Sequence, residues 1–242
     1  MVQSSSETTP FPVDDAGALP LTPLAQSRLI RKLYAAAAPG MRWRQSLRPF
    51  LAPLGEVLEA TPARSRIMDV GCGGGLYLLT LAASGRITDG FGFDASGQAI
   101  AAAHAASKDS GLAGVLRFEH RDVEAGIPDG HWPIVSLIDV LHHIPAARQR
   151  SLVVQLPLHV APGGRLIIRE PVRRPLWRNL ANMLHDLILS GQLVHARDPE
   201  EIEEWLADSG LTLVRKHRSN VLWYGYWLLV YERPTAGSGR AG

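Results

Sequence analysis

A glycine-rich stretch, Asp69-Val70-Gly71-Cys72-Gly73-Gly74-Gly75, constrains the fold of this chain more than any other part of its sequence. It follows the apolar run 66–70, which predicts a buried strand, and it opens a pattern typical of a helix over 75–84. Glycine permits tight turns and lets a ligand approach the backbone N–H groups at a helix N-terminus. A strand, a glycine loop and a helix in this order predict a ligand-binding turn.

The spacing of the glycines separates two kinds of loop. A dinucleotide-binding loop of the G-x-G-x-x-G type, counted from Gly71, needs its third glycine where Leu76 stands. The pattern present is D-x-G-x-G-x-G, so the match to the dinucleotide fingerprint fails.

The rest of the chain alternates between short apolar runs and longer helical patterns, which predicts a mostly parallel sheet covered by helices on both faces. Further strands are expected at 91–94, 115–119, 134–139 and 165–169, and helices at 97–109 and 146–160.

The C-terminal part predicts an antiparallel end to this sheet. Asp198-Pro199-Glu200-Glu201 forms a capping box with proline at the first helical position, so a helix should run to about Ser209. Two strands follow at 211–218 and 221–232, and only Ser219-Asn220 connects them. Such a short connection requires antiparallel pairing. We therefore expect an α/β fold with a seven-stranded mixed sheet, six strands parallel and one antiparallel.

The first sixty residues predict a helical cap on this sheet. Thr22-Pro23 supplies an N-cap and a proline at the first helical position of a helix that should reach about Ala38, and a second helix is expected over 42–59. The cap therefore covers 21–60, before a main domain at 61–233. The remaining segments, 1–20 and 234–242, are rich in small and polar residues and are expected to be mobile.

Composition bounds the class of protein. The chain has 242 residues and a net charge of +2, so nothing global demands nucleic acid. Its single cysteine, Cys72, excludes an internal disulfide and a multi-cysteine zinc site. The N-terminus lacks the pattern of a secretory signal, and the longest apolar run, Val221–Tyr231, is too short to span a bilayer. We expect a soluble, cytoplasmic protein.

An acidic residue follows the glycine loop at an informative distance. Asp94 ends the run Phe91-Gly92-Phe93-Asp94, about twenty residues after the loop, where a carboxylate accepts hydrogen bonds from the hydroxyls of a ribose. The alternative is that Asp94 caps the helix that begins near Gly97.

Taken in order over residues 64–232, these motifs resemble those of class I S-adenosylmethionine (SAM)-dependent methyltransferases, which have a Rossmann-like fold. Asp139-Val140-Leu141-His142-His143-Ile144 and Pro162-Gly163-Gly164 are similar to segments of the small-molecule methyltransferases of bacterial polyketide and quinone pathways. The resemblance implies SAM as cofactor. It places the cofactor contacts at Asp69, Gly71, Cys72, Gly73, Gly75, Asp94, Ala95, Asp122, Val123 and Asp139.

Methyl transfer needs a general base only where the accepting atom starts protonated, and histidine is the usual choice. We expect His142, His143 and Glu170 to be the catalytic residues, with at most one of the adjacent histidines facing the substrate. Glu170 has an alternative role as a partner of Arg169 or Arg173. Asp139-x-x-His142-His143 loosely resembles an E-x-x-E-H metal motif, but two of its three ligand types differ, so we expect no metal.

Segment 171–197 leaves the sheet pattern, predicts an amphipathic helix, and in this superfamily often covers the acceptor pocket. This insertion and the segment 24–48 are basic, which favours an acceptor that is anionic or tethered to an acidic carrier protein, or contact with a phospholipid head group. A merely solvated basic face is the alternative. The expected function is methylation of a small natural-product, quinone or lipid-like acceptor, preferably on oxygen. The alternatives are a nucleic-acid or protein methyltransferase and a catalytically silent SAM-binding protein.

Overall fold

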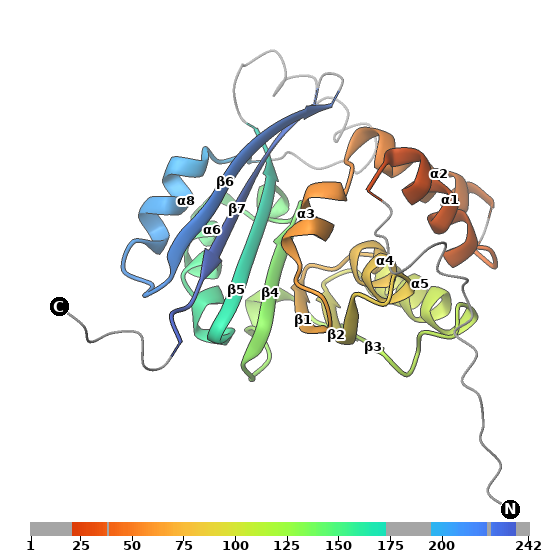
Figure 1. The fold of residues 1–242 in the computed structure, drawn as a ribbon, viewed down its shortest axis with the longest axis horizontal. Helices are drawn as coiled ribbons and strands as arrows, with labels where there is room; N and C mark the ends of the chain where they lie inside the picture. Colours follow the sequence, from red (N-terminus) through yellow and green to blue (C-terminus); the bar gives the residue numbers. More distant parts are fainter. Residues whose placement is uncertain (1–20, 38, 173–194, 222–223, 236–242) are drawn as a thin grey trace, which may run out of the picture.

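The computed structural model describes residues 21–37, 39–172, 195–221 and 224–235, and its centre is a seven-stranded sheet of order β3-β2-β1-β4-β5-β7-β6 (Figure 1). Strands β1 to β5 pair in parallel, whereas β7 is antiparallel to both of its neighbours, β5 and β6. The predicted mixed sheet is therefore confirmed. The strands are β1 (Ser65–Val70), β2 (Ile87–Asp94), β3 (Leu116–His120), β4 (Trp132–Ile138), β5 (Val160–Pro171), β6 (Thr212–Val221) and β7 (Tyr224–Glu232).

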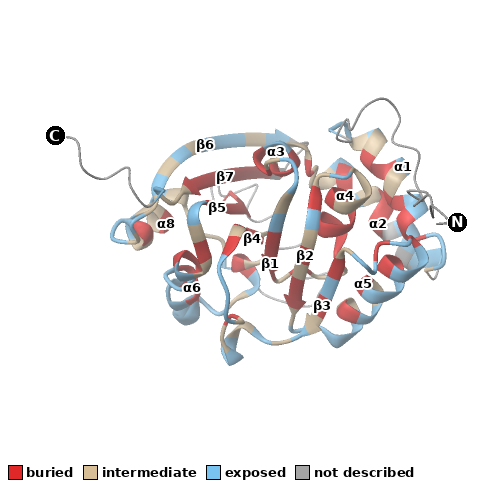
Figure 2. Cartoon of the chain, turned by 60° about the horizontal axis from the view of Figure 1, so that its bottom comes forward, coloured by how far each residue is buried: buried red, intermediate tan, exposed pale blue. Residues whose placement is uncertain are grey.

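Alternation along the central strands creates two hydrophobic cores, one on each face of the sheet (Figure 2). In β1, Ile67 joins one core while Met68 and Val70 join the other. Helices α4 (Leu76–Ala83) and α5 (Gly97–Asp109) cover the first face, and α6 (Ala146–Val153) and α8 (Pro199–Leu206) cover the second.

The N-terminal segment forms three helices, α1 (Pro23–Leu33), α2 (Pro39–Leu51) and α3 (Gly55–Ala60). Helix α1 packs against α2 and also contacts α4 and α5. The expected helix over 42–59 is wrong, because the chain breaks at Ala52-Pro53, where proline has no N–H to donate. The next amide, Leu54 N, donates instead to Oε1 of the buried Gln26 at 3.0 Å.

Three other predicted boundaries are corrected by the structure. Helix α1 ends at Leu33 rather than near Ala38, and α8 ends at Leu206 rather than Ser209. The helix expected over 146–160 ends at Val153 and is followed by a short 3₁₀ helix, η3 (Leu156–His159), which contains a proline. Two further 3₁₀ turns are η1 (Val123–Ala125) and η2 (Leu141–His143).

The connection within the C-terminal hairpin also lies elsewhere than predicted. Ser219 and Asn220 belong to β6, where they pair with Tyr226 and Gly225 of β7. The connection therefore lies between Val221 and Tyr224, outside the described residues, as do most of the insertion 171–197, segment 1–20 and residues 236–242. Among the described helices, none has the length and apolar character needed to cross a membrane.

Candidate active site

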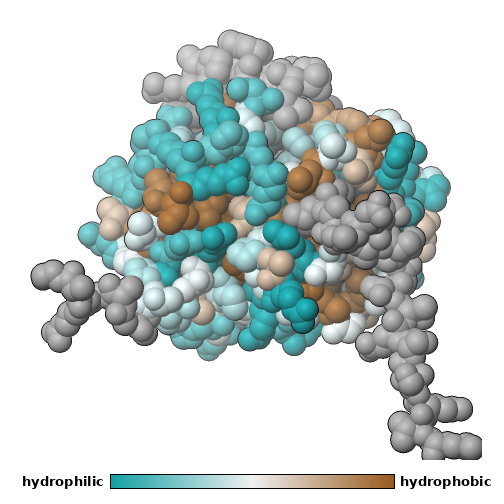
Figure 3. Space-filling view, viewed as in Figure 1, coloured by the Kyte–Doolittle hydropathy of each residue, from teal (hydrophilic) through white to brown (hydrophobic). Residues whose placement is uncertain are grey.

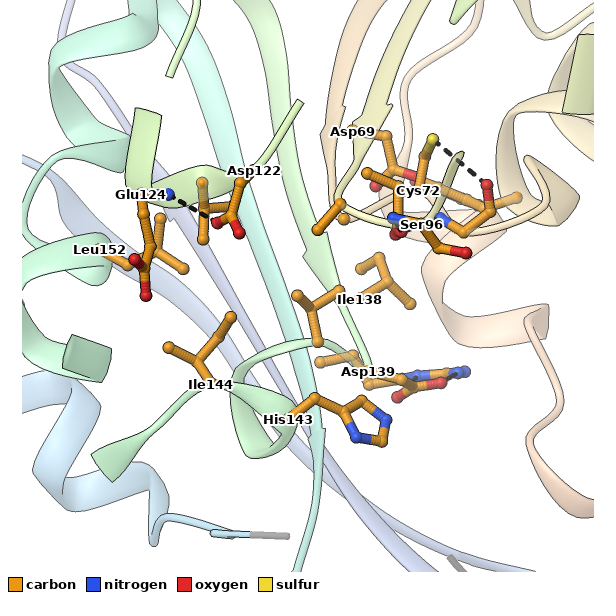
Figure 4. A pocket seen from close by; sticks show the side chains of 18 of the residues that line it. Asp69, Cys72, Ser96, Asp122, Glu124, Ile138, Asp139, His143, Ile144 and Leu152 are labelled. Atoms are coloured by element: carbon orange, nitrogen blue, oxygen red, sulfur yellow. Dashed lines mark hydrogen bonds and ion pairs between the residues drawn. The ribbon is translucent and has the colours of Figure 1, made fainter. Parts of the chain in front are cut away.

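A cavity of about 880 Å³ lies at the carboxyl ends of β1, β2 and β4 (Figure 4). This is the edge where a parallel α/β sheet binds its ligands, beside the point at which the strand order reverses between β1 and β4. Most of the predicted site residues line it, namely Asp69, Gly71, Cys72, Gly73, Asp94, Ala95, Asp122, Val123, Asp139 and His143. Gly75, His142 and Glu170 are not among the lining residues.

The glycines of the loop between β1 and α4 have different roles. Gly71, Gly73 and Gly75 all have positive φ, at 72°, 54° and 80°. A Cβ on Gly71 would lie 2.6 Å from the methyl carbons of Val140, and one on Gly75 would lie 2.9 Å from the Phe118 ring. A Cβ on Gly73 would meet nothing within 4 Å. The outer glycines therefore allow close packing, and the middle one borders open space beside the cavity.

Asp94, the last residue of β2, connects the glycine loop to the start of α5. Its Oδ2 accepts a hydrogen bond from Gly73 N at 2.9 Å, and its Oδ1 accepts one from Ser96 N at 2.8 Å. The N-cap of α5 is Ser96, whose Oγ accepts from Ala99 N at 3.2 Å, so the capping alternative for Asp94 is wrong. The carboxylate lines the cavity and has lone pairs left for further donors.

Asp69 is a buried carboxyl group on the same wall. Its pKa is raised to about 7: burial is the largest cause, the negative charges of Asp94 and Asp139 act in the same direction, and a hydrogen bond donated by Ser136 Oγ at 2.6 Å opposes them. A positively charged group placed beside Asp69 would stabilise its ionised form.

A buried ion pair joins the ends of β4 and β5. The guanidinium of Arg169 donates from Nε to Asp139 Oδ1 at 3.0 Å and from Nη2 to Oδ2. Burial alone would raise the pKa of Asp139, but the charge and hydrogen bonds of Arg169 lower it below its ordinary value. Arg169 thus pairs with Asp139 rather than with Glu170, because the register places Ile138 opposite Arg169.

Arg169 also reaches the N-terminal helices. Its Nη1 donates to the carbonyl oxygen of Pro53 at 2.6 Å, and its guanidinium carbon lies 5.0 Å from the ring centre of Tyr226. Asp139 itself has φ of +56°, a strained backbone conformation for a non-glycine residue. The ion pair therefore holds the turn after β4, the end of β5 and the break between α2 and α3 together.

The carboxylate of Glu170 holds that same turn by accepting hydrogen bonds from it. Its Oε1 accepts hydrogen bonds from Val140 N at 2.8 Å and Leu141 N at 2.7 Å. Its Oε2 accepts from His142 N at 3.1 Å and pairs with His142 Nδ1 at 2.6 Å. Both side chains are almost completely buried. In this structure Glu170 and His142 therefore hold turn η2 and do not reach the cavity.

His143 is the residue of the predicted catalytic set that lines the cavity, where Figure 4 shows it next to Asp139. Its ring has no hydrogen-bond partner among the residues that the structure describes. Its pKa is lowered to about 4: desolvation against the cavity walls is the largest cause, the charges of His142 and Arg48 act in the same direction, and Asp139 acts in the opposite direction. The imidazole is therefore neutral near pH 7, and a ring nitrogen is available to accept a hydrogen bond from a group in the cavity.

The sequence did not single out several residues that line the cavity. Arg48, on α2, lines the cavity. The basic composition of the N-terminal cap did not by itself predict that this arginine belongs to the site. At the far end Arg148 and Glu124 form an ion pair. The side chains of Ile138, Ile144 and Leu152 add apolar surface (Figure 4).

Two side chains of the sequence motif Asp139-x-x-His142-His143, which loosely resembles a metal motif, bind other residues of the protein. Asp139 binds Arg169, and His142 binds Glu170. Within the described parts of the chain there is no cluster of three or more histidine, cysteine or acidic residues that could hold a metal ion.

With this geometry in view, comparison with known proteins assigns the family. A family model described as a methyltransferase domain matches residues 41–216, which is most of the chain. The chain belongs to this methyltransferase family. The predicted class I SAM-dependent methyltransferase is confirmed, and with it the enzyme class and the cofactor.

Relatives of this methyltransferase include enzymes named for one pathway. The ubiquinone biosynthesis O-methyltransferase of Psychrobacter arcticus is 29% identical over 177 residues, which are 69% of this chain and 67% of that protein. The enzyme of the same name from Xanthomonas axonopodis is 28% identical over 159 residues, 63% of this chain and 64% of that protein. The mitochondrial one from Schizosaccharomyces pombe is 33% identical over 125 residues, 51% of this chain and 44% of that protein. The matched segment thus covers from 44% to 67% of the length of these relatives.

Solved structures show the same fold. The magnesium protoporphyrin IX methyltransferase of Synechocystis, with bound SAM, has a TM-score of 0.60 at 18% identity and covers 85% of this chain and 90% of its own. The N-methyltransferase NodS of Bradyrhizobium japonicum, with bound S-adenosylhomocysteine, has a TM-score of 0.60 at 18% identity and covers 86% and 98%. At these identities the similarity establishes the fold and not the acceptor.

We predict that Glu170→Gln destabilises the methyltransferase. In the wild type, backbone N–H groups donate to both oxygens of the Glu170 carboxylate, and the variant replaces one of these oxygens with an NH₂ group that cannot accept a hydrogen bond. The free energy of unfolding, measured by urea denaturation, should fall by about 1–3 kcal/mol. The control is Glu232→Gln, which removes a half-exposed ion pair with Arg165 and should cost less than about 1 kcal/mol. An equal loss in the two variants would contradict a special role for Glu170.

Proposed function

We propose that this methyltransferase transfers a methyl group to a hydroxyl oxygen of a small aromatic, quinol-like or lipid-like acceptor. The observation that carries the proposal is a neutral His143 ring in the same cavity as the glycine loop. A histidine base is needed for a hydroxyl acceptor, which starts protonated, and not for a neutral amine. The names of the relatives, O-methyltransferases of ubiquinone biosynthesis, support oxygen as the accepting atom.

The residues around the cavity fit the cofactor of the family. We assign Asp94 to the ribose hydroxyls, Asp122 and Val123 to the adenine, and Asp69 to the amino-acid end. The raised pKa of Asp69 suits a carboxyl group whose charge is completed by the cofactor's ammonium. The assignment of Asp139 to the cofactor has the least support, because Arg169 already donates hydrogen bonds to both oxygens of its carboxylate. SAM supplies a methyl group on a cationic sulfur, which is a good leaving group.

The protein's own contribution is to position the acceptor and to remove its proton. His143 accepts the proton of the acceptor hydroxyl, which leaves the oxygen a stronger nucleophile. Ile138, Ile144 and Leu152 supply an apolar lining that keeps water away from the reacting atoms. Alignment within such a cavity is the larger part of catalysis for a displacement of this kind.

Arg48 bears on the nature of the acceptor. Arg48 lines the cavity, and among the described residues it has no ion-pair partner. A negatively charged group on the acceptor, or on a carrier protein that holds it, would complement this charge. We therefore include anionic and carrier-tethered acceptors in the proposal.

The cofactor assignment predicts that Asp94→Ala weakens SAM binding by at least about 1 kcal/mol, as expected for the loss of charge-assisted hydrogen bonds. Isothermal titration calorimetry with SAM and S-adenosylhomocysteine measures this. Asp129→Ala, at an exposed loop position outside the cavity, is the matched control and should bind normally. Unchanged affinity in Asp94→Ala would refute the ribose assignment, and absence of binding by the wild type would refute the site.

The proposed reaction predicts that the protein forms S-adenosylhomocysteine when it is given SAM with substituted catechols or hydroquinones. His143→Gln should lower kcat by about a hundredfold with little change in SAM affinity, because the base is lost and the cofactor contacts remain. His131→Gln, at an exposed position away from the cavity, is the control.

Full activity in His143→Gln would remove this histidine from the mechanism. Turnover with RNA or protein substrates but none with small hydroxylated aromatics would favour the macromolecular alternative. SAM binding without turnover of any acceptor would favour the catalytically silent one.

A further inference from the structure

The N-terminal helices α1 and α2 present an unusual surface. Seven large apolar side chains are exposed in the described part of the chain, and four of them lie within residues 21–50. Trp43 is 67% exposed and Leu24 is 53% exposed, although aromatic and aliphatic side chains of this size are normally covered. The other two, Leu21 and Phe50, are each 40% exposed.

The charge of the same segment is entirely positive. Residues 21–51 contain six arginines and lysines and no aspartate or glutamate. Arg28, Arg31 and Lys32 are exposed and make no ion pair with described residues. The segment therefore carries a cationic charge that nothing described in the chain neutralises.

Helical geometry places these apolar and basic side chains together. On α1, Leu24, Arg28, Arg31 and Lys32 are spaced i, i+4, i+7 and i+8, so they share one solvent-facing stripe. On α2, Trp43 and Phe50 are seven residues apart and also share a stripe. Figure 3 shows apolar and hydrophilic surface interleaved where these two helices lie in Figure 1.

We propose that this α1–α2 face docks on the surface of an anionic lipid bilayer. Exposed tryptophan, leucine and phenylalanine together with arginine and lysine, on two helices that pack against each other, suit the boundary between head groups and acyl chains. The aliphatic stems of the basic side chains lie along apolar surface while their charged ends meet phosphate groups. A protein partner would instead favour one contiguous apolar patch. On α1, the exposed Leu24 shares its stripe with basic side chains and with no other large exposed apolar one.

Helix α2 also connects this face to the active-site cavity. Trp43 and Phe50 are exposed on it, while Arg48, between them in sequence, lines the cavity. A docked bilayer would thus lie beside the entrance used by a lipid-soluble acceptor. This consequence rests on the proposed function, whereas the docking itself does not.

Co-sedimentation of the full-length protein with vesicles tests the proposal. We expect binding to phosphatidylcholine vesicles that contain phosphatidylglycerol, weakened by high salt, and little binding to phosphatidylcholine alone. Arg31→Gln should lower the partition coefficient about fivefold, and Arg28→Gln, Arg31→Gln and Lys32→Gln together should lower it by at least about tenfold. Trp43→Ser should also weaken binding.

Two controls match these variants. Leu158 is 66% exposed, nearly the same as Trp43, but lies on η3, so Leu158→Ser should bind vesicles like the wild type. Arg150 is exposed on α6, away from α1 and α2, so Arg150→Gln should do so too. Circular dichroism establishes that each variant is folded.

Absence of vesicle binding, or binding that Arg31→Gln and Trp43→Ser leave unchanged, would overturn the proposal. Tight RNA binding lost in the same variants, without vesicle binding, would assign the face to nucleic acid instead. SAM binding and methyl transfer are measured without vesicles, so failure of the docking proposal and failure of the proposed function give different results.

Discussion

The four hydrogen bonds that converge on the buried carboxylate of Glu170 determine the shape of this active site. Three come from the consecutive backbone amides of Val140, Leu141 and His142, which would otherwise be unsatisfied at the start of a 3₁₀ turn, and one comes from the His142 ring. Because unpaired buried donors are costly, the turn has little freedom to adopt another conformation. His143, the next residue, is thereby held in the cavity.

The same turn is fixed from its other side by the pair of Asp139 and Arg169. Arg169 extends this support to the carbonyl of Pro53, so the N-terminal helices are attached to the carboxyl ends of the central strands. Tyr34 makes a second attachment, since its hydroxyl donates to the carbonyl of Gly74 at 2.7 Å. The cofactor loop, the turn that carries His143 and the N-terminal helices thus form one connected structure around the cavity.

The sequence predicted the succession of strands and helices along the chain because each of its signals was local. The glycine loop, the Asp94 strand end and the capping box at Asp198 depend on residues close in the chain, and the structure has each of them where expected. The role of Glu170 could not be predicted, because its partners lie about thirty residues away and depend on the register of β4 and β5. The break after α2 was missed because Pro53 competes with a good helical pattern on both sides. The two adjacent histidines could be separated only by structure, which buries His142 and exposes His143.

The central claim is that the turn presents a neutral imidazole to the cavity, and an NMR titration of the His143 ring tests it most directly. The signal is assigned by its loss in His143→Gln and needs neither cofactor nor acceptor. The account predicts a midpoint at a pH of about 4, which leaves the ring neutral throughout the physiological range. A midpoint at the ordinary value of 6.5 would contradict it, because the cavity walls, His142 and Arg48 would then not act on the ring as the structure shows.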